Sequence, residues 1–222
     1  MDERIWNIIV DSFWPLLRAG VAFTVPLTLI SFALGLLLAV LTALARLSAL
    51  WPLRQIAKFY VWIIRGTPLL VQLFVIFYGL PSLGVTLNPF PAAVIGFTLS
   101  VGAYGSEIVR AAILSIHAGQ WEAAYSVGMT RMQALRRIIL PQASRVSVPP
   151  LANSFISLVK DTSLAATITY TEMFRTAQQI TATTYEPLVV YVEAGLIYLF
   201  FSSLLSALQN VLEKRLDRFS AR

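Results

Sequence analysis

A long stretch without charged residues constrains this chain more than any other feature. Between Arg18 and Arg46, residues 19–45 include no Asp, Glu, Lys or Arg. A helix of about 20 apolar residues spans the ~30 Å hydrocarbon core of a bilayer, so this stretch is long enough for one crossing with some tilt. A second stretch without charge occupies residues 66–106. The sequence therefore predicts a protein that crosses a membrane several times.

The composition agrees with a membrane protein and excludes several kinds of site. Of the 222 residues, 57% are hydrophobic and 13% are charged, against roughly 25% charged in a typical soluble domain. The sequence has no cysteine, which excludes disulfides and thiolate metal sites. Its single histidine, His117, has no neighbours of ligand type, so no metal site is expected.

Prolines divide the apolar stretches into separate predicted helices. Residues 66–106 are too many for one crossing, and the prolines between residues 81 and 91 mark a loop, because proline lacks the N–H that an interior helical turn needs. The sequence therefore predicts an all-α integral membrane protein with five transmembrane helices in one domain, residues 1–222. The five spans are expected at 17–45, 66–80, 92–114, 142–159 and 187–212.

The positions of Lys and Arg predict the orientation, because cytoplasmic loops near the spans are enriched in them. The segment 46–65, the segment between the third and fourth spans, and the tail with Arg218 and Arg222 are basic. The N-terminus, the proline-rich loop and the segment 160–186 are neutral or acidic. We therefore expect the N-terminus outside, the C-terminus inside, and 46–65 as an inside loop. The net charge of +6 is explained by this topology, so no nucleic-acid partner is expected.

Small residues at four-residue spacing occur in the first and third spans. Such stripes let helix backbones approach closely in lipid. They predict helix packing within the chain, with a subunit interface as the alternative. The stripes are Ser31, Gly35, Ala39 and Ala43 in the first span, and Ala92, Gly96 and Ser100 in the third.

The inside segment between the third and fourth spans is predicted to be an amphipathic helical hairpin. Gly128 suits the left-handed position just past a helix end. Thr130 followed by Gln133 is a capping box that starts the next helix. Pro141 disfavours helical geometry at Leu140 and is expected to mark the exit toward the fourth span. These features alone fit a membrane-surface helix on anionic lipid and a protein-docking element equally well.

One run in this hairpin resembles the EAA signature of the permease subunits of ABC importers. The run Glu122-Ala-Ala is followed by Gly128, nine further residues and Ile-x-Leu-Pro. Three other runs are similar to the polar amino acid branch of that family. Within that branch, the overall sequence is most similar to L-cystine permeases. These runs begin at Arg65 (RGTPLLVQ), Glu107 (EIVRAA) and Asn153 (NSFISLVKDTSLA).

The resemblance implies a type I importer in the bacterial cytoplasmic (inner) membrane. Two permease subunits would form the pathway, with a homodimer favoured over a heterodimer, and an extracytoplasmic binding protein would deliver a polar amino acid such as L-cystine. A dimer of ATP-binding subunits would dock on the coupling segment 119–141 and would bind ATP and Mg, so this chain needs no cofactor of its own. It also lacks a glycine-rich phosphate loop followed by Lys-Ser/Thr. The docking residues would be Glu122, Ala123, Ala124, Gly128, Leu140 and Pro141.

Ionisable side chains within the spans are candidates for the substrate pathway, because they are costly in hydrocarbon. Glu107 lies toward the inner end of the third span, and Arg110 follows on the same helical face. The two form either part of the pathway or a mutually neutralising pair that anchors the gate region. Glu193 is expected near the outer face, where its carboxylate can reach water.

Polar uncharged side chains in the fourth span are further candidates. Asn153, Ser154 and Ser157 place an amide and two hydroxyls at three- and four-residue spacing. These groups suit the carboxylate and ammonium of an amino acid, and they also suit hydrogen bonds between helices.

Two other classes of function are considered. A self-sufficient secondary transporter or channel should show inverted repeats or several buried titratable groups. A membrane-embedded hydrolase needs a Ser/His/Asp set or a His/Glu metal site. The sequence shows none of these features, so it predicts a transport subunit that is not itself an enzyme.

Overall fold

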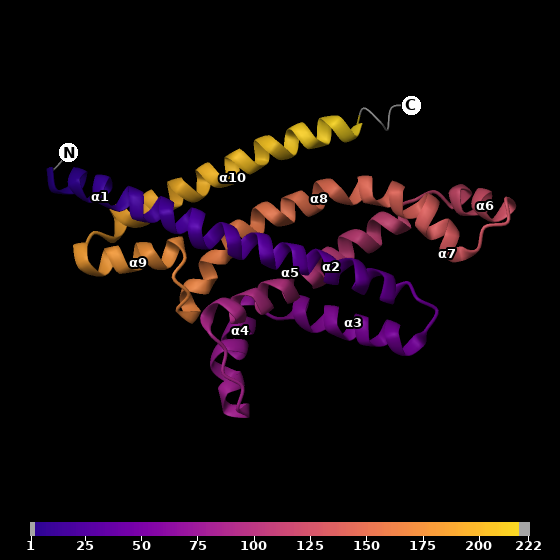
Figure 1. Cartoon of the computed structure of the whole chain (residues 1–222), viewed down its shortest axis with the longest axis horizontal. Coiled ribbons are helices and arrows are strands. Elements are labelled where there is room, and N and C mark those ends of the chain that lie inside the picture. The colour runs from indigo at the N-terminus through magenta and orange to yellow at the C-terminus, as the bar shows by residue number, and fades with distance from the viewer. Residues whose placement is uncertain (1–2, 218–222) are drawn as a thin grey trace.

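Every regular element in residues 3–217, the part of the chain that the computed structural model describes, is a helix (Figure 1). This confirms the predicted all-helical class. The elements, including π-helical and 3-10 turns labelled η, are α1 (Glu3–Ala19), η1 (Gly20–Thr24), α2 (Val25–Arg46), α3 (Trp51–Gly66), α4 (Leu69–Phe74), η2 (Val75–Gly79), η3 (Leu80–Leu83), α5 (Pro89–Leu114), α6 (Ala118–Ser126), α7 (Arg131–Ala134), η4 (Leu135–Ile139), α8 (Leu140–Asp161), η5 (Thr162–Ile168), α9 (Met173–Thr184) and α10 (Pro187–Asp217).

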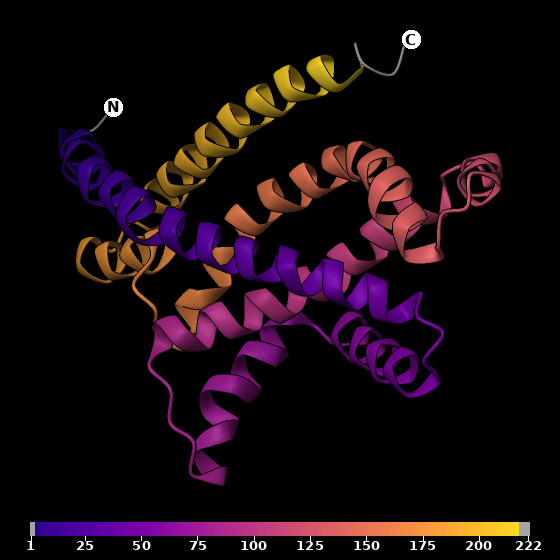
Figure 2. The same ribbon diagram turned by 45° about the vertical axis from the view of Figure 1, so that its right-hand side comes forward.

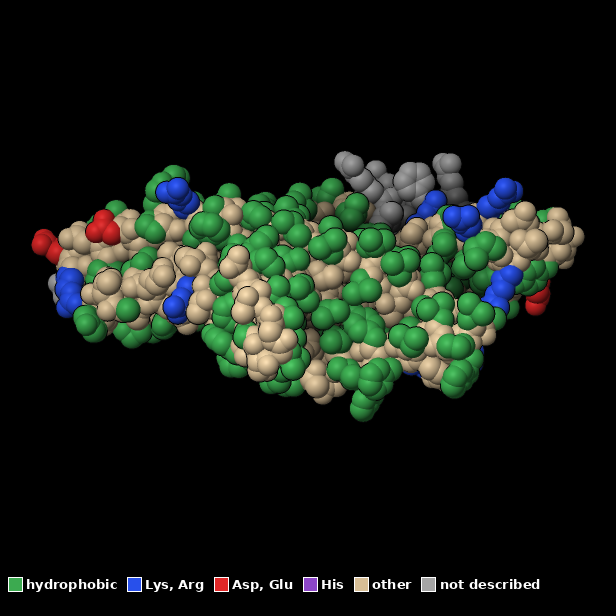
Figure 3. All heavy atoms as spheres, turned by 60° about the horizontal axis from the view of Figure 1, so that its bottom comes forward, with side chains coloured by type: hydrophobic (Ala, Val, Ile, Leu, Met, Phe, Trp, Pro, Cys, Tyr) green, Lys and Arg blue, Asp and Glu red, His purple; other side chains and the backbone are tan. Residues whose placement is uncertain are grey.

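The helices form an elongated bundle around α2 and α5. These two helices make the most extensive contact, and α8 packs against both of them. A second group consists of α1, α9 and α10, which contact one another. The α6–α7 hairpin lies at one end of the long axis, and η5 and α9 lie toward the other (Figures 1 and 2). In Figure 3 hydrophobic side chains cover the middle of the visible face and charged side chains gather toward its two ends, as a body that spans a bilayer requires.

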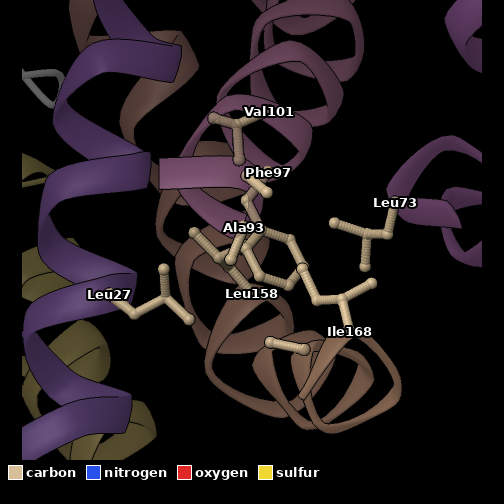
Figure 4. Packing of buried hydrophobic residues seen from close by; sticks show 9 residues of the cluster. Leu27, Leu73, Ala93, Phe97, Val101, Leu158 and Ile168 are labelled. Carbon is tan, nitrogen blue, oxygen red and sulfur yellow. The ribbon is translucent and has the colours of Figure 1, made fainter. Parts of the chain in front are cut away.

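The centre of the bundle is an apolar cluster built from five elements (Figure 4). Leu27 of α2, Leu73 of α4 and Phe97 of α5 are fully buried in it. Leu158 of α8 and Ile168 of η5 complete the cluster. This cluster fixes α8, whose polar residues matter below, against α5.

Small residues allow the close contact between α2 and α5. The residues of the first predicted stripe are all buried. A Cβ placed on Gly35 would lie 2.6 Å from the Cβ and Cγ1 atoms of Val101 in α5, so no larger residue fits without separating the helices. The prediction that this stripe serves packing within the chain is confirmed.

Three prolines are accommodated by π-helical turns. η1, η2 and η4 each end two residues before a proline, namely Pro26, Pro81 and Pro141. In each turn the last N–H bonds to the carbonyl five residues back, as Leu140 does to Leu135. The wider turn removes the clash between the proline ring and the carbonyl four residues earlier. Leu140 is therefore helical (φ −60°, ψ −41°), and the prediction that the helix ends there is wrong.

Three helical stretches are long and apolar enough to cross a membrane, namely Glu3–Arg46, Pro89–Leu114 and Pro187–Lys214. They contain the predicted first, third and fifth spans. The first stretch has 44 residues, or about 66 Å at 1.5 Å per residue, so α1 extends well beyond a bilayer core.

The other two predicted spans differ from simple crossings. The helices Trp51–Gly66 and Leu69–Leu83 are apolar enough only as a pair, and they are bent by 105° relative to each other. The predicted fourth span lies within α8, which is helical throughout but more polar than α2, α5 and α10.

The segment predicted to be an inside loop, 46–65, is mostly helix α3. Its only proline, Pro52, lies in the first turn, where a helix tolerates it. Ala57, Val61 and Ile64 recur at helical spacing and are buried, so the segment has an apolar helical face. The loop prediction missed this face because it relied on the basic residues of the segment. Arg218 of the predicted basic tail, with Arg222, lies outside the described residues.

Candidate functional site: the hairpin between α5 and α8

Caps at both ends hold α6 in place. His117 precedes the helix, and its Nδ1 accepts a hydrogen bond from the Gly119 N–H at 3.1 Å. After the helix, Gly128 has a φ of +78°, and the Met129 N–H donates to the Ala124 carbonyl at 3.1 Å. This arrangement is a Schellman closure. The prediction of a left-handed glycine here is confirmed, and the single histidine acts as a helix cap.

The predicted capping box starts α7. The Gln133 N–H donates to Thr130 Oγ1 at 3.3 Å, and the Thr130 N–H donates to Gln133 Oε1 at 2.9 Å. Two backbone donors that a helix start leaves free are thereby satisfied. Because both caps are formed, the backbone between α6 and α7 is held in one conformation.

The hairpin rests on the ends of α2 and α5. Ile139 of η4 is fully buried there, and Trp121 of α6 packs against the same cluster. Arg131 Nη2 donates to the Leu47 carbonyl at 3.3 Å, which ties α7 to the residue after α2. The other buried members of the cluster are Ala43, Val109, Ala112, Ile113 and Ala143. Burying an isoleucine contributes about 2 kcal/mol, so the hairpin is a fixed part of the bundle.

The other face of the hairpin is exposed and partly apolar. Tyr125, Val127 and Met132 are 47%, 73% and 60% exposed. Glu122 and Ala123 are exposed beside them. Large exposed apolar side chains on a rigid element are typical of an interaction surface.

The structure separates the six predicted docking residues into two sets. Glu122, Ala123, Gly128 and Pro141 are exposed. The other two face the protein. Ala124 is only 4% exposed and lies inside the hairpin, and Leu140 is half-buried and packs against the cluster that seats η4.

Glu107 of α5 joins three arginines from three helices. Its Oε1 accepts a hydrogen bond from Arg65 Nη1 at 2.9 Å and lies 2.8 Å from Arg46 Nη1, an ion pair without hydrogen-bond alignment. Its Oε2 lies 3.4 Å from Arg110 Nε. The expected contact between Glu107 and Arg110 is thus present, but it is one of three.

The arginines of α2 and α3 were missed by the sequence reasoning. A signal was available, because the segment 46–65 holds four basic residues and no acid, so its cations need a carboxylate from elsewhere. The Arg65 guanidinium also lies over the Tyr104 ring, 5.4 Å from the ring centroid, a cation–π contact. The three arginines and Glu107 therefore link the C-terminal ends of α2 and α3 to α5, close to the apolar cluster on which the hairpin packs.

The polar residues predicted in the fourth span lie on α8. Asn153 and Ser157 are exposed, and so is Lys160 on the same face. Ser154 is half-buried and donates to the Pro150 carbonyl at 3.0 Å, so its hydroxyl has a partner within the helix. Exposed amide and hydroxyl groups are costly against hydrocarbon. This face of α8 therefore suits water or a polar surface better than lipid tails.

Glu193 does not reach water, and that expectation is wrong. It is 7% exposed and accepts a hydrogen bond from the Ser12 hydroxyl of α1. The physical reason is that the helix starts at Glu3 rather than near residue 17, so α1 covers this part of α10. In the described chain Glu193 connects two helices.

A further buried carboxylate, Glu172, was not predicted. It is fully buried and caps α9 by accepting from the N–H groups of Phe174 at 2.8 Å and Arg175 at 2.7 Å. The Tyr198 hydroxyl of α10 donates to it at 2.7 Å. Burial raises the pKa of Glu172, although these hydrogen bonds oppose the shift. A Glu directly before an amphipathic helix was the available signal.

Comparison with known proteins assigns this arrangement to a family. The model of the binding-protein-dependent transport system inner membrane component matches residues 33–218. The L-cystine transport system permease protein TcyB of Bacillus subtilis (strain 168) is 57% identical over 218 residues, which cover 98% of this chain and 93% of that protein.

Solved structures agree with the same assignment. A crystal structure of an amino acid ABC transporter with histidines has a TM-score of 0.88 and 35% identity, and the match covers 93% of this chain and 96% of that one. The inward-facing MetNI methionine ABC transporter has the same fold, with a TM-score of 0.70, 21% identity, and coverage of 97% and 99%. The chain belongs to the family of inner membrane components of binding-protein-dependent transport systems, as a multi-pass ABC transporter permease.

Proposed function

We propose that this chain is the transmembrane subunit of an ATP-driven importer of polar amino acids, with L-cystine as the first substrate to test. The substrate class is supported by the relative named as an L-cystine permease, which is 57% identical over nearly the whole chain. The related structure with histidines is also an amino acid transporter.

The observation that carries the proposal is the capped hairpin that rests on α2 and α5 and exposes Glu122 on its free face. An ATP-binding subunit that docks on this face can move the ends of two central helices, because Ile139 connects them to the hairpin. ATP and Mg bind to that partner subunit, and this chain supplies no cofactor site. Closure of the ATP-binding dimer then turns the pathway outward, and hydrolysis resets it.

The pathway lies between two permease subunits, and we favour two copies of this chain. The exposed polar face of α8 supports this arrangement, since Asn153 and Ser157 need water or a polar partner. Glu107 and Ser154 belong to the same proposed pathway region by their place on α5 and α8. An extracytoplasmic binding protein delivers the substrate to the opposite end, with the N-terminus outside and the hairpin inside.

The experiment is co-purification of the ATP-binding subunit with permease variants. Glu122→Lys reverses the charge on the exposed face, and Gly128→Trp adds a large ring there. A non-glycine residue in the left-handed region costs about 1–2 kcal/mol, and a Cβ at Gly128 meets no atom within 4 Å, so the bundle should remain folded. Both variants should be found in the membrane at wild-type levels but should lose the ATP-binding subunit.

Matched controls lie outside the hairpin, one between η3 and α5 and the other at the start of α1. Gly84 has a φ of +81° and an equally open surrounding, so Gly84→Trp introduces the same strain and bulk away from the hairpin. Glu3→Lys reverses the charge of an exposed residue at the start of α1. Both controls should retain the ATP-binding subunit. Wild-type association of Glu122→Lys and Gly128→Trp would show that the hairpin is not the docking site.

The substrate is tested separately by uptake into proteoliposomes that contain the intact complex and its binding protein. Labelled L-cystine should accumulate only with ATP, and unlabelled cystine should compete more strongly than a nonpolar amino acid. Uptake that continues without ATP would contradict the ATP-driven mechanism.

A further inference from the structure

The arginine cluster around Glu107 carries more positive charge than its carboxylate neutralises. Three guanidinium groups lie within 3.4 Å of one carboxylate, and no second acid forms a salt bridge with them among the described side chains, residues 3–214. The Nε of Arg46 is buried and has no hydrogen-bond acceptor there either. Two positive charges are therefore left over at the point where α2, α3 and α5 meet.

The surplus charge is accessible to a ligand on one side. The Arg46 side chain is 13% exposed, whereas those of Arg65 and Arg110 are 44% and 35% exposed. Glu107 uses only part of the donor capacity of these two groups, since a guanidinium has five N–H donors. An anion with several oxygens can bind both arginines from the exposed side.

The surface that continues from Arg65 along α3 is aromatic and basic. Trp62 lies three residues before Arg65, on the same face, and is 71% exposed. One turn earlier, Phe59 is 60% exposed and its ring lies 5.9 Å from that of Trp62. Lys58 and Gln55 border a shallow groove with these two rings. Aromatic rings beside cations are typical of a helix at the boundary between lipid headgroups and acyl chains.

We propose that Arg65, Arg110 and Lys58, with the rings of Phe59 and Trp62, form a binding site for an anionic phospholipid. The phosphate lies against Arg65 and Arg110, and an acyl chain covers the rings. Lys58 lies seven residues before Arg65, about 10 Å along the helix, and attracts the anionic headgroup electrostatically rather than by direct contact. A free inorganic phosphate offers the same oxygens but no acyl chain. The exposed rings therefore favour the lipid over the free anion as the occupant.

The test measures lipid binding to the delipidated intact complex by native mass spectrometry. Phosphatidylglycerol is the anionic probe and phosphatidylcholine the neutral one, with inorganic phosphate as a competitor. The wild type should bind phosphatidylglycerol more tightly than phosphatidylcholine. Lys58→Gln should weaken phosphatidylglycerol binding about fivefold, the factor that corresponds to ~1 kcal/mol per cation at an anionic membrane surface. Trp62→Gln should weaken binding of both lipids.

Lys58 is the main variant because it forms no contact with Glu107, so its loss leaves the ion cluster and the fold intact. Arg110→Gln should have a similar effect, and its binding is interpreted only alongside a melting curve. Lys214→Gln removes an exposed cation from α10 and should leave binding unchanged. Equal binding of the two lipids, or equal loss in Lys58→Gln and Lys214→Gln, would overturn the site. Displacement of the lipid by millimolar phosphate would overturn the choice of lipid as the ligand.

Discussion

The contact between α2 and α5 leads to a sharp prediction at Gly35. In Gly35→Ala the new methyl would lie 2.6 Å from both the Cβ and the Cγ1 atoms of Val101, and 3.2 Å from the Thr98 carbonyl oxygen. Ordinary contacts begin at 3.4 Å, so the overlap with Val101 is about 0.8 Å. A rotation of the Val101 side chain cannot remove it, because the Cβ atom is fixed by the backbone. The two helices must therefore separate.

The expected cost follows from overpacking in other cores. An extra methylene in a well-packed interior costs typically 1–3 kcal/mol. For a chain of this size each kcal/mol lowers the melting temperature by about 2–4 °C, so Gly35→Ala should melt roughly 2–12 °C below the wild type. The measurement is thermal unfolding of the detergent-solubilised complex, followed by tryptophan fluorescence at constant ligand and detergent concentration.

A matched control separates overpacking from any general effect of replacing a helical glycine. Gly195 lies in α10, and a Cβ there meets no atom within 4 Å. Gly195→Ala should therefore keep or raise the melting temperature, because alanine stabilises a helix by about 0.5–1 kcal/mol relative to glycine. If the two variants melted at the same temperature, overpacking between α2 and α5 at Gly35 would not determine the melting temperature.

Two further predictions concern a buried carboxylate and a proline. For Glu172, burial raises the folded-state pKa above the unfolded value of about 4.3, so its contribution to stability is fully present at low pH and falls as the pH rises toward the folded pKa. The wild type should therefore gain melting temperature relative to Glu172→Gln when the pH falls from 7 to 5, and a constant difference would refute this. For exposed Pro141, replacement by alanine restores an N–H and removes a ring without opening a cavity. Pro141→Ala should therefore melt no lower than the wild type, whereas a loss of several degrees would show that the ring itself stabilises the bundle.

Local signals in the sequence predicted the hairpin well. Gly128, Thr130 and Gln133 act through neighbours within a few residues, so their spacing was enough to predict the left-handed turn and the capping box. The stripe that contains Gly35 was also readable, because small residues at four-residue spacing form one face of a helix regardless of the partner.

Features that depend on distant parts of the chain could not be read in the same way. Arg65 lies 42 residues before Glu107 in the sequence and Arg46 lies still further away, so no local pattern joins them. The burial of Glu193 depends on Ser12, 181 residues away. The error at Pro141 has a different cause, because the rule that proline ends a helix assumes an α-helical turn before it, whereas a π-helical turn accommodates the ring.

The position of that π-helical turn has a consequence for the proposed coupling. Ile139 is buried against α2 and α5, and these helices are in close contact near Gly35. Packed interiors resist compression, so a displacement of the hairpin by an ATP-binding subunit moves α2 and α5 together. The connection to α8 is different, because η4 has the wider hydrogen-bond spacing that permits bending. We therefore expect any bending during coupling to occur at η4, where the hairpin joins α8, rather than by separation of α2 from α5.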